Sequence, residues 1–159
     1  AAAALVNGGY LLPATFMPRS RAEARELAKP VLRADTSRDM RYLMRLNVTK
    51  GTATKADVEG YRVGGKTGTA EKAINGRYVK NRLLTSFLAA FPMDNPRYVV
   101  LVMLDEPQGT AETHGYATAG WNAAPLTGQI VRRVAPMLGV LPRSEEDAEP
   151  GSRVTLASY

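Results

Sequence analysis

The sequence predicts an α+β domain in which helices flank an antiparallel sheet. Three segments rich in strand-forming residues, 61–72, 83–91 and 97–106, follow one another with only short turns between them. Helical periodicity occurs before and after this block. Parallel strands would need long crossover connections, so the short turns favour an antiparallel meander.

Composition narrows the class of protein. The chain has 159 residues, 45% of them hydrophobic, which suits one domain with a real core. Cysteine is absent, which excludes disulfides, zinc thiolates and a thiol nucleophile. The net charge of +6 suits an anionic partner, although solvated arginine-rich helices are the simpler explanation. No aromatic-basic motif or zinc-finger spacing supports nucleic-acid binding, and no apolar run reaches the roughly 18 residues of a membrane span.

The first 35 residues predict short elements. Residues 1–6 are typical of the last turns of a helix, with Asn7-Gly8-Gly9 as its stop. We therefore expect the N-terminal part of the fold to precede these residues. Two prolines interrupt an extended piece over 10–18, and residues 19–29 predict an exposed helical turn or a loop that Pro30 ends.

The clearest helix is predicted over 36–51. Thr36 and Asp39 resemble a capping box at its start, and Gly51 ends it. Its apolar face is expected to consist of Met40, Leu43, Met44 and Val48.

The three strands are predicted next. Asn75-Gly76 forms a two-residue turn after the first strand, and the sequence PMDNP supplies the turn before the third. The second and third strands are so rich in apolar residues that we expect both of their faces to be covered.

A loop and a final helix complete the predicted domain. The helix begins near Trp121, and Pro136 is expected to kink or end it. Its buried face is predicted to contain Leu126, Ile130, Val134, Met137 and Leu138. We assign residues 1–142 to the domain and predict a disordered tail over 143–159.

The stretch YRVGGKTGTAEK, residues 61–72, carries the chemistry. Its glycines weaken an ordinary strand and are typical of a close approach by another backbone, such as a peptide pairing along the edge. Strand alternation places Lys66 and Gly68 on one face and Thr67 and Thr69 on the other. The threonine hydroxyls suit a carboxylate, and a backbone N–H at the edge suits an oxyanion hole.

Two other interpretations of this stretch stay open at this point. A glycine-rich edge strand with a solvated lysine would give the same three-residue match by chance. Residues 60–67, GYRVGGKT, also fit the phosphate-binding P-loop template. A P-loop follows a buried strand and opens a helix, whereas ATKADVE precedes this stretch and the short, glycine-broken GTAEKAINGR follows it.

Four segments together resemble one known family. GYRVGGKTGTAEK, TSFLAAFP, PRYVVLVMLDEP and GYATAGWNAAPLTGQIVRRVAPMLGV resemble, in order and spacing, the C-terminal half of the penicillin-binding protein transpeptidase domain. MRYLMRLNVTKGTATKADVEGY is similar too, so the resemblance extends from Ala1 to about Pro142. It is closest to the class B, cell-division type, the septal peptidoglycan D,D-transpeptidase. The resemblance implies part of the fold shared with serine β-lactamases.

The resemblance also implies roles for individual residues. Lys66 would adjust the electrostatics around the nucleophile and its proton shuttle, and the Thr69 N–H would give half of the oxyanion hole. Thr67 and Thr69 would hold the carboxylate of the substrate or of a β-lactam. Gly68 would let the acyl-donor peptide lie close. Tyr116 would form a wall of the substrate site, or else pack within its own loop. No cofactor or metal is implied.

The chain departs from the family pattern in one decisive respect. No serine is followed three residues later by lysine, and no Ser-x-Asn occurs. We expect the nucleophile and the second motif to precede Ala1, and these residues alone to be inactive. The loop YATAGW is bulkier than the Gly-Gly usual there. His114 is predicted to be a surface loop residue, and Asp105 and Glu106 a solvated strand end.

Two functional hypotheses follow. In the first, the chain is part of an enzyme that transfers an acyl group from a stem pentapeptide to a neighbouring amine through an acyl-serine. In the second, it is a noncatalytic module that binds β-lactams or a partner. The expected partners are peptidoglycan stem peptides, β-lactam antibiotics, the N-terminal remainder of the protein and other cell-division proteins, but no nucleic acid. The expected location is the periplasmic face of the bacterial inner membrane, with the anchor outside these residues.

Overall fold

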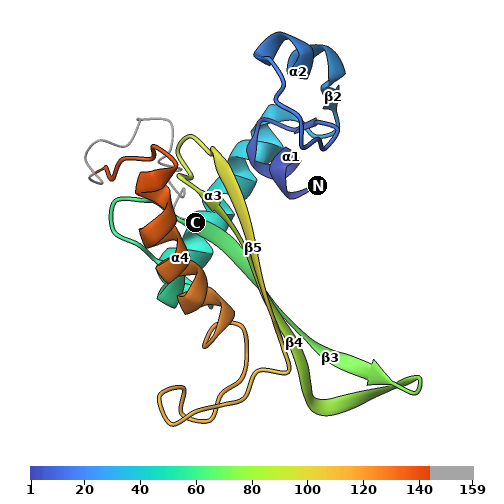
Figure 1. The fold of residues 1–159 in the computed structure, drawn as a ribbon, viewed down its shortest axis with the longest axis vertical. Coiled ribbons are helices and arrows are strands. Elements are labelled where there is room, and N and C mark those ends of the chain that lie inside the picture. Colours follow the sequence, from blue (N-terminus) through green and yellow to red (C-terminus); the bar gives the residue numbers. More distant parts are fainter. Residues whose placement is uncertain (144–159) are drawn as a thin grey trace, which may run out of the picture.

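The computed structural model describes residues 1–143 and confirms an α+β fold with an antiparallel sheet (Figure 1). The predicted disordered tail, apart from Arg143, lies outside the described residues. Within the described part, no helix combines the length and the apolar character needed to cross a membrane. The elements are α1 (Ala2–Val6), β1 (Tyr10–Leu11), α2 (Arg21–Leu27), β2 (Lys29–Pro30), α3 (Ala34–Lys50), the 3-10 helix η1 (Thr54–Ala56), β3 (Gly64–Ile74), β4 (Arg77–Phe91), β5 (Tyr98–Asp105) and α4 (Ala123–Met137).

The N-terminal elements form a small unit beside α3. Helix α1 stops as predicted, with Gly8 and Gly9 at φ angles of 97° and 95°. The segment left open between helical turn and loop is a helix, α2, and it begins with a reciprocal capping box between Ser20 and Glu23. Strands β1 and β2 pair antiparallel around it.

Helix α3 begins two residues earlier than predicted, so the proposed capping box of Thr36 and Asp39 is wrong. A tertiary contact replaces the cap. The buried Ser37 hydroxyl donates to the Leu5 carbonyl at 2.8 Å and accepts from the Gly8 N–H at 3.0 Å. The first turn of α3 is therefore fastened to α1 by a serine that lies inside the helix.

The apolar face of α3 is partly as predicted. Met44 and Val48 are buried, but Leu43 is 53% exposed. Gly51 ends the helix as expected, in extended rather than left-handed backbone. Val48 joins the main core, whereas Met44 packs with Val6, so α3 links the N-terminal unit to the sheet.

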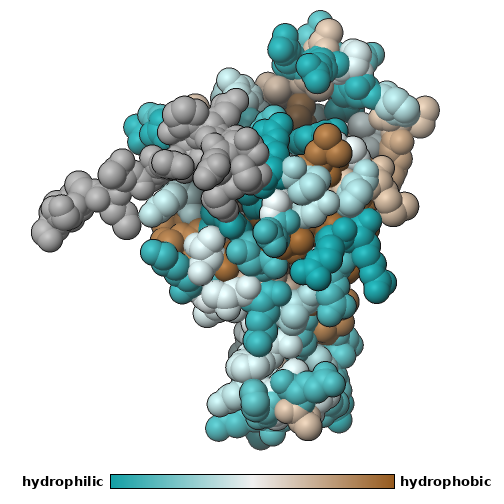
Figure 2. All heavy atoms as spheres, turned by 90° about the vertical axis from the view of Figure 1, so that its left-hand side faces the viewer, coloured by the Kyte–Doolittle hydropathy of each residue, from teal (hydrophilic) through white to brown (hydrophobic). Residues whose placement is uncertain are grey.

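The three-stranded sheet has the order β3-β4-β5, with both pairs antiparallel. Asn75 and Gly76 have φ angles of 50° and 76°, which confirms the predicted two-residue turn. The β3–β4 hairpin projects away from the body (Figure 1), and the projecting end of the molecule is mostly hydrophilic (Figure 2). The P-loop alternative is wrong, because Lys66 lies inside β3 and no helix follows it.

Only one face of β5 is covered in the described part of the chain, which corrects the expectation of two. Tyr98, Val100, Val102 and Leu104 contribute to the core beneath α4. Alternate residues point the other way and stay exposed: Val99 by 41%, Leu101 by 55% and Met103 by 53%. The apolar sequence of β5 is typical of a strand covered on both faces, but α4 packs against only one face of it.

The buried face of α4 is partly as predicted, since Leu126 and Ile130 are half-buried against the core. Met137 is 83% exposed, and the fully buried positions are occupied by small or medium-sized residues. They are Ala123, Ala124, Thr127, Gly128, Val131 and Ala135. A Cβ on Gly128 would lie 3.3 Å from the backbone of Ala56, so small residues let α4 approach η1 closely. The helix ends at Met137, one residue after Pro136, as predicted.

Replacing Phe87, whose side chain is fully buried under α4, should test the core directly. We expect Phe87→Ala to lower the free energy of unfolding by about 3–5 kcal/mol, because it removes apolar contacts and leaves a cavity. Urea unfolding measures this loss. The control, Tyr78→Ala, removes a ring that is 77% exposed and should change the free energy little. Equal losses in the two variants would contradict the assigned core.

Candidate active site

The candidate site lies along the edge of β3 that no strand pairs within residues 1–143. The Gly65 carbonyl accepts a hydrogen bond from the Asn47 side chain of α3 at 2.9 Å, and the Thr67 carbonyl accepts one from Lys66 Nζ at 2.8 Å. Both carbonyls therefore point away from β4. Backbone groups alternate along a strand, and the pairing with β4 is regular from Gly64 to Glu71. The Thr69 N–H accordingly points to the same free edge.

Packing within the protein explains the glycines of this strand. A Cβ on Gly64 would lie 2.6 Å from the Met93 side chain and 3.0 Å from a backbone nitrogen of α3. A Cβ on Gly65 would lie 2.6 Å from the Phe87 ring. Gly68 faces the Ser86 hydroxyl, 2.7 Å from its virtual Cβ. The glycines thus let α3 and β4 approach β3 closely.

The lysine and the threonines of the motif lie on opposite faces of β3. Thr67 pairs with Phe87 across the ladder, so its side chain shares the face of β4 that packs under α4. Thr69 shares that face, and Lys66 lies on the other, as strand alternation predicted. A ligand at the free edge would meet the Thr69 N–H between the two sets of side chains.

The threonines open into a cavity of about 350 Å³ between three segments. It is lined by Thr52, Thr54, Lys55, Thr67, Thr69, Thr118, Gly120 and Trp121. Sequence reasoning found only the two threonines of β3. The others come from η1, from the loop before it and from the loop before α4. Threonine and glycine are frequent in the sequence around these positions, and this is the one local feature that marks them. That η1 and α4 pack together is visible only in the structure.

Hydrogen bonds fix the hydroxyls at the cavity wall. The Ala119 N–H donates to the Thr69 hydroxyl at 3.1 Å. The Thr67 and Thr52 hydroxyls lie 2.9 Å apart. Asn47 Oδ1 lies 3.2 Å from both the N–H and the hydroxyl of Thr52. The end of α3 therefore helps to position a hydroxyl on β3.

Tyr116 does not line the cavity itself but contacts Trp121, which does. It is 56% exposed, and its ring stacks on Trp121 with centroids 5.3 Å apart. His114 meets the same indole edge-on at 5.6 Å and is exposed on the loop, as predicted. The three rings form one cluster, so Tyr116 supports the cavity through Trp121.

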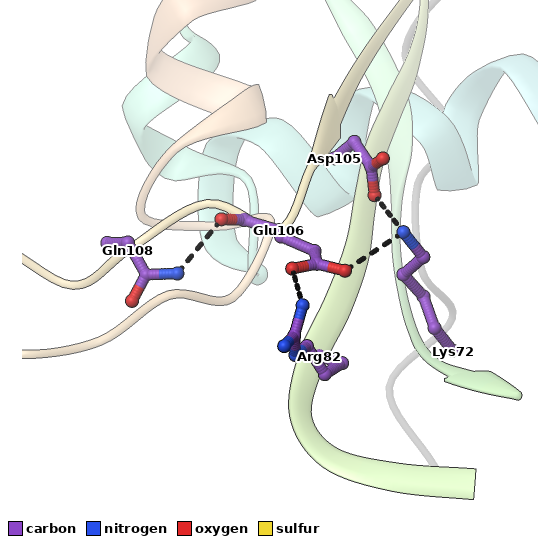
Figure 3. Close-up of polar contacts among 5 residues, drawn as sticks. All are labelled: Lys72, Arg82, Asp105, Glu106 and Gln108. Atoms are coloured by element: carbon purple, nitrogen blue, oxygen red, sulfur yellow. Dashed lines mark hydrogen bonds and ion pairs between the residues drawn. The ribbon is translucent and has the colours of Figure 1, made fainter. Parts of the chain in front are cut away.

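An ion-pair cluster ties the lower end of β3 to β4 and to the end of β5 (Figure 3). Lys72 Nζ lies 2.8 Å from Asp105 and 3.0 Å from Glu106, and Arg82 binds the other oxygen of Glu106. The carboxylates predicted to be a simple solvated strand end are thus paired. Hydrogen bonds from Lys72 and Arg82 lower the pKa of Glu106, and those to Asp105 and Glu106 raise the pKa of Lys72.

The cluster sits where the β3–β4 register shifts, between Glu71 and Lys72. It therefore fixes the hairpin arm just beyond the candidate site. Residues 1–143 contain no group of three or more histidine and carboxylate side chains placed to hold a metal ion.

The family model and the similar proteins of known sequence point to the same family. The family model described as penicillin binding protein transpeptidase domain matches residues 1–132. The protein named "Probable peptidoglycan D,D-transpeptidase FtsI" of Caulobacter vibrioides is 46% identical over 89% of this chain. "Stage V sporulation protein D" of Bacillus subtilis is 39% identical over 92%. The chain spans only 26% and 23% of the lengths of these two relatives.

Solved structures show the same similarity. The apo transpeptidase domain of Burkholderia pseudomallei penicillin-binding protein 3 matches with a TM-score of 0.75 and 34% identity, over 88% of this chain and 41% of that one. Penicillin-binding protein 3 of Mycobacterium tuberculosis, solved in complex with ampicillin, matches with a TM-score of 0.71 and 27% identity. That match covers 94% of this chain and 35% of the other.

The pKa shift of Glu106 predicts a pH-dependent contribution to stability. Because the folded-state pKa is lowered, the stabilisation is present above the ordinary value of 4.5 and is lost as the pH falls through the folded-state pKa. We expect Glu106→Gln to lower the melting temperature at pH 7 and the difference from wild type to shrink in acid. The control Glu59→Gln removes an exposed carboxylate outside the cluster. The same pH-dependent difference in both variants would contradict this assignment.

Proposed function

Because the chain belongs to the penicillin-binding protein transpeptidase family, we propose that it forms the substrate-binding strand of a serine-type peptidoglycan D,D-transpeptidase of the cell-division type. One observation carries the proposal. The Thr69 N–H points to the free edge of β3, with Lys66 on one side and the Thr67 and Thr69 hydroxyls on the other. This arrangement matches the needs of acyl transfer from an extended peptide.

The proposed reaction proceeds through an acyl-serine. A serine oxygen attacks the carbonyl between the last two residues of a stem peptide ending in D-Ala-D-Ala, and the terminal D-Ala leaves with the proton on its amine. The amine of a neighbouring stem then displaces the serine, which forms the cross-link. A β-lactam acylates the same serine by ring opening, so that no leaving group departs.

Each residue of the motif has a distinct role in this proposal. The Thr69 N–H donates to the oxyanion of the tetrahedral intermediate, a contribution of about 2.7–4 kcal/mol for such a donor. Lys66 places a positive charge beside the reacting groups and eases proton transfer. The Thr67 and Thr69 hydroxyls bind the terminal carboxylate. Gly68, which also makes room for the Ser86 hydroxyl, lets the donor peptide lie close to β3, and Tyr116 supports Trp121 at the wall.

The nucleophile is proposed to belong to a part of the enzyme outside these 159 residues. None of the six serines begins a Ser-x-x-Lys motif; they are Ser20, Ser37, Ser86, Ser144, Ser152 and Ser158. The chain corresponds to about a quarter of the Caulobacter relative, which leaves ample length for the missing motifs in a protein of that size.

A noncatalytic module is the second candidate, and the missing serine motif is the observation that favours it. Such a protein would bind a β-lactam or a peptide at the same edge without forming a covalent bond. A Ser-x-x-Lys in the gene upstream of these residues would favour the enzyme, and its absence the module.

The proposed partners and location follow from the substrate. Stem peptides of peptidoglycan and β-lactams would bind at the free edge of β3. The N-terminal part of the enzyme would be a further partner and would pack against the described residues. We place the site on the periplasmic face of the inner membrane, because the cell wall is assembled there. Other cell-division proteins are further proposed partners, and nucleic acid is not one.

The 159 residues alone should not form a covalent adduct with benzylpenicillin, because the acylated serine is absent. Mass spectrometry of the incubated chain measures this, with a complete penicillin-binding protein as the positive control. A stoichiometric acyl adduct on any of the six serines would show that the nucleophile lies within this chain.

Lys66→Ala in the complete enzyme should slow acylation by benzylpenicillin about 100-fold or more, since it removes a charge next to the proton transfer. The melting temperature should change little, because Lys66 is exposed. Stopped-flow measurement gives the second-order rate constant. The matched control is Lys80→Ala, which removes an exposed lysine from β4. If Lys66→Ala acylates as fast as wild type, the active-site assignment of β3 fails.

A further inference from the structure

The cavity beside β3 has the chemistry of an anion site. Five of its eight lining residues are threonines, one is Lys55, and none is an aspartate or a glutamate. Hydroxyls and an ammonium group can all donate hydrogen bonds to an anion. With no acidic side chain on its wall, the cavity repels no negative charge at close range.

The hydroxyls of the cavity are arranged to donate. The Thr69 hydroxyl already accepts from the Ala119 N–H, so its own hydrogen is available to a ligand. The Thr52 hydroxyl donates its one hydrogen to Asn47 Oδ1, so Thr67 donates to Thr52 in the absence of a ligand. A bound anion would compete with Thr52 for the hydrogen of Thr67. Two neutral hydroxyls, however, leave the charge of a carboxylate uncompensated.

Lys66 is poorly placed to supply that compensation. Its side chain lies on the opposite face of β3, and its ammonium donates to the Thr67 carbonyl at 2.8 Å. Among the described residues that line the cavity, Lys55 is the one cation. Within residues 1–143, no carboxylate lies at ion-pair distance from it.

Aromatic contacts hold Lys55 in place. Its Nζ lies 4.4 Å from the centroid of the Trp121 ring, a cation–π contact. Trp121 is in turn stacked on Tyr116 and lines the same cavity. Lys55 sits in η1, which packs against α4, and Trp121 lies just before α4, so the packing of these two helices brings the lysine and the indole together.

We propose that Lys55, positioned by Trp121, is the cation that binds the carboxylate of the ligand held by Thr67 and Thr69. The inference rests on the proposed function and adds a residue outside the Lys-Thr-Gly motif. The ligand class is an acyl donor with a free carboxylate near its reacting carbonyl, as in a peptide C-terminus or a penicillin. In this arrangement Lys66 eases proton transfer at the reacting atoms, and Lys55 binds the carboxylate by which the ligand is recognised.

The test compares benzylpenicillin with its uncharged methyl ester in the complete enzyme. The ratio of their second-order acylation rate constants measures recognition of the carboxylate. Lys55→Gln should reduce this ratio by at least about 10-fold, the change expected on losing a hydrogen bond to a charged group. The ester rate itself should stay close to wild type. Lys55→Arg should restore most of the ratio, and the control Lys80→Gln should not alter it.

The role of Trp121 is tested in the same assay. Trp121→Leu should lower the ratio in the wild-type background but not in the Lys55→Gln background, since a positioning residue acts through the group it positions. A general structural defect would instead slow both ligands in both backgrounds, which would count against the proposal.

The outcomes separate this inference from the proposed function. An unchanged ratio in Lys55→Gln, with Lys66→Ala inactive, would overturn the role of Lys55 and leave the transpeptidase assignment intact. Normal acylation in Lys66→Ala would overturn the assignment of β3 as the active-site strand. A reduced ratio restored by arginine would support both.

Discussion

One side chain, Asn47 near the end of α3, sets the geometry on which the site depends. Its amide donates to the Gly65 carbonyl at 2.9 Å, where a neighbouring strand would otherwise bind. Its oxygen lies 3.2 Å from the hydroxyl of Thr52, which reaches Thr67 at 2.9 Å. The helix thus binds the edge of β3 at Gly65, and in the described residues no strand pairs with the backbone beyond it, which leaves that backbone available to a ligand.

The packing of α4 serves the same site from the other side. Gly128 and the alanines of its buried face let the helix approach η1, and this contact fixes η1, which carries Lys55. Asn122 is the N-cap of α4, and its side-chain oxygen accepts from Thr85 on β4 at 2.9 Å. The segment just before it contributes Trp121 to the cavity. Close packing of small residues is therefore what brings a lysine and an indole into contact at the cavity wall.

Local patterns predicted the parts of the fold that depend on local rules. The Asn75-Gly76 turn and the alternation of Lys66 with the threonines follow from backbone chemistry over a few residues. The start of α3 and the buried face of α4 could not be predicted in this way. The first is decided by Ser37 bonding to α1, and the second by how closely two backbones approach. The cavity is formed where tertiary packing brings β3, η1 and the segment before α4 together. Local sequence patterns therefore predicted only its two threonines on β3.

The most direct test of the account is a crystal structure of the complete enzyme acylated by benzylpenicillin. The account predicts the acyl carbonyl oxygen within hydrogen-bond distance of the Thr69 N–H, at the free edge of β3. It also predicts the carboxylate in the cavity, in contact with the Thr67 and Thr69 hydroxyls. An acyl group bound away from this edge, with the cavity empty, would contradict the assignment of β3 as the substrate-binding strand.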